Sequence, residues 1–124
     1  MRIVDANVIL RYILGDHAEL SARSRIVIDE NTIVVPIEVL SEVVYVLSSV
    51  YKVERQDICT ELCRFIEETA CILPYHNVAI RALHLFAENN LDFVDCALAG
   101  YSFVEGATIY TFDKKLQRLL NNSK

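Results

Sequence analysis

Glycine and proline are scarce in this sequence, with three glycines and two prolines among 124 residues. Because these residues form most turns and loops, their scarcity excludes collagen-like chains and Pro/Gly-rich disordered chains. No linker-like segment and no internal repeat divides the chain, so we expect one domain over residues 1–124. The hydrophobic fraction of 53% is high enough to give that domain a single substantial core.

Long hydrophobic runs are also absent. No apolar stretch reaches the ~18 to 20 residues that a membrane-spanning helix needs. Asp5 and Arg11 interrupt the first apolar segment, where a signal peptide would need an unbroken hydrophobic core. We therefore expect a cytoplasmic protein with no membrane partner.

Basic charge is not in excess, since the net charge is −5 at pH 7. This balance argues against binding nucleic acid through a broad basic surface, but it leaves room for a nuclease, whose own carboxylates add negative charge. Cysteine motifs are missing as well, because no CxxC pair and no Cys/His spacing of the zinc type occurs. We expect the four cysteines to be reduced core residues with no role in metal binding or disulfides: Cys59, Cys63, Cys71 and Cys96.

Regular structure should occupy most of the chain. Four short runs rich in β-branched residues predict strands: Arg2–Val4, Thr32–Val35, Cys71–Leu73 and Thr108–Thr111. Longer segments of helical period predict helices: Ala6–Leu14, Ala18–Asp29, Ile37–Val50, Arg55–Glu68, Val78–Glu88, Asp92–Val104 and Lys114–Leu120. Short apolar strands separated by helices predict an α/β fold of three layers, α/β/α, with a short and mainly parallel central sheet.

Acidic residues follow several of these elements. Asp5 ends the first predicted strand and Asp113 follows the last, while Glu42 lies on the helix after the second strand. Asp92 and Asp95 share one face at the start of a later helix, and each aspartate has an alternative role as a helix cap or a partner of the helix dipole. Parallel α/β sheets place ligands beyond the carboxyl ends of their strands, so we expect these carboxylates to converge there.

Carboxylates gathered in this way repel one another unless a cation lies among them. Ligands that are all oxygen select a hard ion such as Mg²⁺ or Mn²⁺. Such an ion suits phosphodiester hydrolysis, because it lowers the pKa of a bound water and stabilises charge on the phosphate. The acidic pattern therefore predicts a metal site with nuclease chemistry.

Four segments together resemble the acidic motifs of PIN-domain ribonucleases, in particular the VapC-like toxins of toxin–antitoxin pairs: VDANVILRY, VPIEVLSEVVYVL, LDFVDCALAGYS and IYTFDKKL. The resemblance implies an endoribonuclease dependent on Mg²⁺ or Mn²⁺, a homodimer, and an antitoxin whose C-terminal segment blocks the acidic pocket. By position, it gives catalytic and metal-binding roles to Asp5, Glu42, Asp95 and Asp113. It makes Asn7 and Thr111 polar groups beside the metal, and Asp92 a less central acid. Cys96 departs from the alanine of many relatives.

Two other functions remain open. One is an RNA-processing or DNA-acting PIN nuclease outside any toxin–antitoxin pair, and the other is a non-catalytic PIN domain that binds RNA or a protein partner. Basic residues near the motifs could contact phosphates, although solvated helix faces explain them equally well: Arg11, Lys114, Lys115 and Arg118. A dimer is expected because apolar residues exceed what one small sheet can cover, on Ile37–Val50 and at Cys59, Leu62, Cys63, Phe65 and Ile66.

Overall fold

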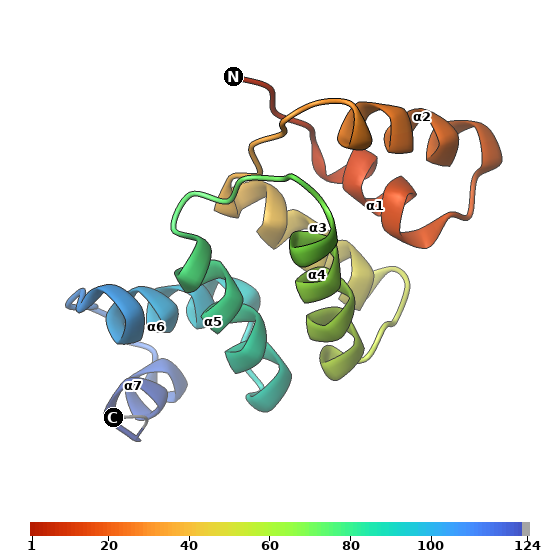
Figure 1. Ribbon diagram of the computed structural model, residues 1–124. Helices are drawn as coiled ribbons and strands as arrows, with labels where there is room; N and C mark the ends of the chain where they lie inside the picture. The colour runs from red at the N-terminus through yellow and green to blue at the C-terminus, as the bar shows by residue number, and fades with distance from the viewer. Residues whose placement is uncertain (123–124) are drawn as a thin grey trace.

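The computed structural model describes residues 1–122, and helices dominate that part of the chain (Figure 1). In chain order the helices are α1 Ala6–Leu14, α2 Ala18–Asp29, α3 Ile37–Ser49, α4 Arg55–Glu68, α5 His76–Glu88, α6 Phe93–Glu105 and α7 Lys114–Asn122. No helix in these residues is both long and apolar enough to cross a membrane.

The predicted central sheet is wrong. Within residues 1–122 the extended segments form only two isolated parallel bridges, Ile3 with Val34 and Val34 with Ile72. Three backbone hydrogen bonds of 2.7 to 2.8 Å hold these segments together, one of them donated by the Val34 N–H to the Arg2 carbonyl. Only one bridge joins each pair of neighbouring runs, and both bridges use Val34, which is too little for a continuous ladder of the slanted bonds of a parallel sheet.

The fourth predicted strand, Thr108–Thr111, forms no bridge in the described residues. Its Tyr110 side chain is 93% exposed, and the following Phe112 is fully exposed. This segment is therefore an open connection between α6 and α7, and it contributes no strand to the three paired segments. The three-layer α/β/α arrangement is replaced by helices packed around three short extended segments.

The helix predictions hold, because most of the helices have an apolar stripe that can be buried. Helix α2 is the exception, since two of its three buried residues are serines. Helices α1, α2 and α4 have the predicted bounds, and α3 ends one residue earlier than predicted. Helix α5 begins at His76, two residues early, after Tyr75 in a left-handed conformation (φ 55°). Helix α6 begins at Phe93, because Asp92 is its N-cap and lies outside the helix.

Packing joins the helices in chain order, α1 with α2, α4 with α5, α5 with α6 and α6 with α7 (Figure 1). Helices α5 and α6 approach closely at Gly100, where an added Cβ would lie 3.1 Å from the Val78 carbonyl oxygen. On α4 the residues expected to leave apolar surface for a dimer are instead covered by the chain itself. Cys63 is half-buried, and the other four are buried: Cys59, Leu62, Phe65 and Ile66.

Candidate functional site

Asp5 begins α1 and borders a cavity with Glu42 of α3. The Asp5 Oδ1 atom accepts a hydrogen bond of 3.3 Å from the Val8 N–H, so this carboxylate caps the helix. Asp5, Asn7 and Glu42 are all exposed, and they line one cavity of about 400 Å³. Asp5 and Glu42, which follow the two segments joined by the Ile3–Val34 bridge, therefore line one exposed cavity.

Arg11 lines the same cavity and brings the only positive side chain among its lining residues. Its guanidinium donates to Asp16 Oδ1 at 2.8 Å and to the Tyr51 hydroxyl at 2.7 Å. The Tyr51 hydrogen bond is the largest cause of the raised pKa of Arg11, and Asp16 adds to it. Arg11, one of the basic residues that the sequence places near the acidic motifs, is therefore a fixed cation beside Asp5 and Glu42.

Asp92, Asp95 and Asp113 form a second acidic group, at the starts of α6 and α7. Asp92 caps α6 by accepting a 2.9 Å hydrogen bond from the Asp95 N–H. Burial raises the pKa of the half-buried Asp95, and the charges of Asp92 and Asp113 raise it further. Only carboxylates that lie near one another affect each other in this way, so α6 and α7 bring these three acids together.

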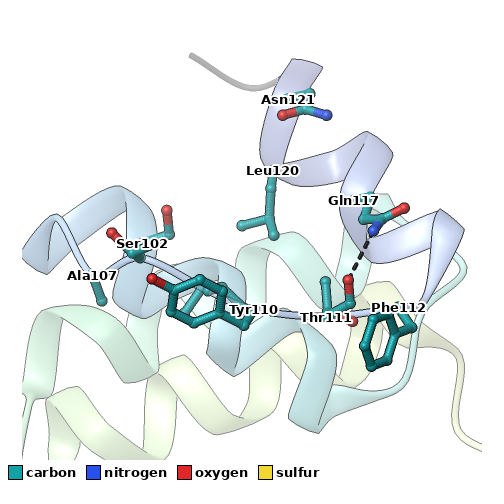
Figure 2. A pocket seen from close by; sticks show the side chains of 10 residues that line it. Ser102, Ala107, Tyr110, Thr111, Phe112, Gln117, Leu120 and Asn121 are labelled. Carbon is teal, nitrogen blue, oxygen red and sulfur yellow. Dashed lines mark hydrogen bonds between the residues drawn. The ribbon is translucent and has the colours of Figure 1, made fainter.

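Asp113 is positioned by the segment before α7. Its Oδ1 atom accepts a 2.8 Å hydrogen bond from the Leu116 N–H, and its own N–H donates to Thr111 Oγ1 at 3.0 Å. Figure 2 shows the second anchor of this segment, where the Gln117 side chain donates to the Thr111 carbonyl at 2.8 Å. Thr111 therefore fixes the turn that positions Asp113. Thr111 and Gln117 also line a cavity of about 540 Å³.

The acids do not form a closed metal cage in the described residues. Across residues 1–122 the one group of three possible ligand atoms within 4.8 Å of one another is Cys59, Cys63 and His84, with no carboxylate among them. The donor chemistry nevertheless fits a hard ion, because every member of the two acidic groups offers oxygen. Each capping hydrogen bond uses only Oδ1, which leaves the second carboxylate oxygen of Asp5, Asp92 and Asp113 to face an ion.

The cysteine and histidine group was missed at the sequence level. All four cysteines are free thiols, as expected, but Cys59 and Cys63 lie one helical turn apart on α4, beside His84 of α5. Their i, i+4 spacing is the signal that was available in the sequence, since it places two side chains on one helix face.

A family model for the PIN domain matches residues 2–120. The chain therefore belongs to the PIN-domain family, whose members are in general metal-dependent nucleases. The family fold is α/β, and this chain retains three parallel extended segments of such a fold without a sheet. Neither a curated protein nor a solved structure matches the chain.

The raised pKa of Asp95 makes a prediction about stability and pH. A folded-state pKa above the unfolded value means that ionising Asp95 costs stability as the pH rises past its ordinary value of 3.8. Asp95→Asn should therefore raise the free energy of unfolding at pH 7 in EDTA, and this gain should shrink to nothing as the pH falls below 3.8. Urea denaturation across that pH range measures the difference.

Asp57→Asn is the matched control, because Asp57 occupies the same first-turn position of α4. The N-cap of α4 is also an acid, Glu54, so this variant reports the loss of a helix-dipole contact next to a cap acid but without Asp113. If Asp95→Asn loses stability at pH 7 as Asp57→Asn does, the three carboxylates do not repel one another.

Proposed function

We propose that this PIN-domain protein is an endoribonuclease that binds Mg²⁺ or Mn²⁺ through Asp5, Glu42, Asp95 and Asp113. The observation that carries the proposal is the placement of Asp92, Asp95 and Asp113 at the starts of the packed helices α6 and α7. Their charges raise the pKa of Asp95, and a divalent cation would relieve this repulsion. The cavity that Asp5 and Glu42 share also supports the proposal, because it brings two more carboxylates together. Family membership makes nuclease chemistry the expected use of such carboxylates.

The chemistry follows from what each side chain offers. When bound, the ion lowers the pKa of a water molecule and stabilises the negative charge that develops on the phosphate. Asp95 and Asp113 hold it with carboxylate oxygens from the starts of α6 and α7, and Asp92 stays mainly a cap. Thr111 sets the position of Asp113, and Asn7 offers an amide at the edge of the cavity that holds Asp5.

A basic pocket next to the second acidic group suits an RNA backbone. Lys115 and Arg118 of α7 line a cavity of about 420 Å³ together with Asn89, Asn90 and Leu91, directly before Asp92 in the chain. Both cations are exposed, so they can contact phosphates without losing partners inside the protein. Contacts of this kind position a nucleic acid and do not read its sequence.

A second function has one specific observation in its favour. No three carboxylates in residues 1–122 have ligand oxygens within 4.8 Å of one another, and three of the acids already serve as helix caps. A PIN domain that only binds RNA or a protein needs no closer carboxylate cluster than this, because it holds no catalytic metal. The two functions differ in one measurable property, which is metal-dependent cleavage.

Within the first function, we assign the chain the role of a toxin that acts as a homodimer and is held in check by an antitoxin. The groove between α3 and α6 supports a dimer, because Tyr45 and Val94 line it while being 61% and 55% exposed. Exposed apolar side chains such as these two are typical of a surface that another chain covers. The antitoxin should present Arg or Lys to Asp5 and Asp113, since bidentate Arg–carboxylate pairs are strong.

The first test of this function is cleavage of RNA. Wild-type protein should cut labelled RNA with Mg²⁺ or Mn²⁺ and not with EDTA, and Asp5→Asn should lower the rate at least about 100-fold, more than the usual loss from a residue that only supports a ligand. The fold should survive, because asparagine caps a helix about as well as aspartate. Gel-based rates and circular dichroism melts measure the two effects.

Glu68→Gln, an exposed acid at the end of α4, is the control for loss of charge alone and should cleave at the wild-type rate. Single-stranded DNA in the same assay separates RNA-acting from DNA-acting enzymes. Normal cleavage by Asp5→Asn refutes the assigned site, and a folded wild type with no metal-dependent cleavage supports the binding-only function.

The partner assignment has a separate test, the mass of the species in solution. Light scattering of the isolated protein at micromolar concentration should give twice the chain mass, and Val94→Asp should give the monomer because it puts a charge in the groove. Protein isolated from its native host should carry a small partner that Asp5→Asn and Asp113→Asn release. A monomeric wild type argues against the dimer, and a partner-free chain that causes no growth defect argues against the toxin.

A further inference from the structure

Helices α4 and α5 pack against each other (Figure 1). Two thiols and one imidazole nitrogen meet between them. Cys59 and Cys63 contribute thiols from successive turns of α4, and His84 contributes a ring nitrogen from α5. The ligand atoms of all three lie within 4.8 Å of one another, and Cys59 Sγ is 3.7 Å from His84 Nδ1. None of these residues belongs to either acidic group.

The spacing of these atoms matches a tetrahedral zinc site. With Zn–S near 2.3 Å and Zn–N near 2.1 Å, a tetrahedral ion separates a sulfur ligand from a nitrogen ligand by about 3.6 Å. The 3.7 Å between Cys59 and His84 is therefore already the separation that zinc requires. Thiolate and imidazole ligands favour Zn²⁺ over Mg²⁺ or Mn²⁺, which prefer oxygen.

Nearby carboxylates favour a cation at the three residues, although burial makes ionisation of the two thiols costly without one. Burial raises the pKa of the Cys63 thiol to about 12, and the neighbouring Cys59 and the carboxylate of Glu67 add to that rise. Burial likewise raises the pKa of Cys59, with Glu88 adding to the rise, so both acids lie close to the thiols. His84 is exposed, which gives an ion a path to the two cysteines from solvent.

We propose that Cys59, Cys63 and His84 bind one Zn²⁺ ion that links α4 to α5. Binding displaces one proton from each thiol to solvent, so a neutral imidazole and two thiolates give the bound ion no net charge. Three protein ligands leave the fourth position to a water molecule or to Glu88, one turn beyond His84 on α5. The ion ties two neighbouring helices together, and this role is separate from that of the carboxylates.

Cobalt is the optical probe for this site, because zinc itself is colourless. Metal-free protein kept under a non-thiol reductant should bind one Co²⁺ per chain, with the thiolate-to-cobalt charge-transfer absorption and the visible bands of a tetrahedral site, and Zn²⁺ should bleach both. His84→Gln and Cys63→Ser should lose the absorption. Cys71→Ser removes a half-buried thiol outside the cluster and should keep it. Asp95→Asn should also keep it, since the acidic group is a different site.

Thermal melts provide the second measurement. At about 100 times its dissociation constant, Zn²⁺ should raise the wild-type melting temperature by roughly 5 to 15 °C, because it binds only the folded state. His84→Gln should show no rise, and its melt without metal should stay close to that of wild type since His84 is exposed.

A folded wild type without thiolate-to-cobalt absorption overturns the proposal and leaves a simple thiol–imidazole hydrogen bond between Cys59 and His84. Absorption that persists in both His84→Gln and Cys63→Ser overturns it too, because the metal then binds elsewhere.

Discussion

Aspartates at the starts of helices are the feature on which the candidate site depends. Asp5, Asp92 and Asp113 each accept a backbone N–H of the helix that they begin, which satisfies a donor that has no partner within the helix. The positive end of each helix dipole also stabilises the negative charge. The starts of α6 and α7 can therefore hold Asp92, Asp95 and Asp113 close together although these carboxylates repel one another.

A capping aspartate in this protein can therefore also be a proposed metal ligand. A carboxylate has two oxygens, and the cap occupies only one. Asp95 is different, because it follows the cap of α6 and gains no capping bond of its own from its carboxylate in the described residues. The charges of Asp92 and Asp113 raise the pKa of Asp95, so this pKa should respond to a bound cation.

The sequence was sufficient to predict the helices, since their periodicity states directly which residues can be buried. The strands were not predictable in the same way, because a run such as Arg2–Val4 has β propensity whether it forms a ladder or a single bridge with Val34. Asp5, Asp92 and Asp113 were recognisable as possible caps, and they are caps. The sheet edge at which they were expected to meet is absent. The starts of α6 and α7 bring Asp92, Asp95 and Asp113 together, and the convergence of Asp5 with them stays a prediction.

The cysteines show a different limit of sequence reasoning. Their apolar surroundings correctly predicted free thiols, and all four lie in or beside the helix core. Yet the pairing of Cys59 and Cys63 with His84 depends on the register between α4 and α5, which no local pattern contains. A contact between two helices is set by packing along their whole length, so a ligand set divided between them is visible only in three dimensions.

The account depends most on the claim that carboxylates from both acidic groups hold one divalent ion. Crystals of the metal-free protein soaked in Mn²⁺ test it directly, through the anomalous scattering of the metal. The account predicts a peak contacted by Asp95 and Asp113 together with Asp5 or Glu42, and the same peak reduced or lost in Asp95→Asn. A well-ordered crystal with no manganese peak among these side chains, or with a peak only at Cys59, Cys63 and His84, would contradict it.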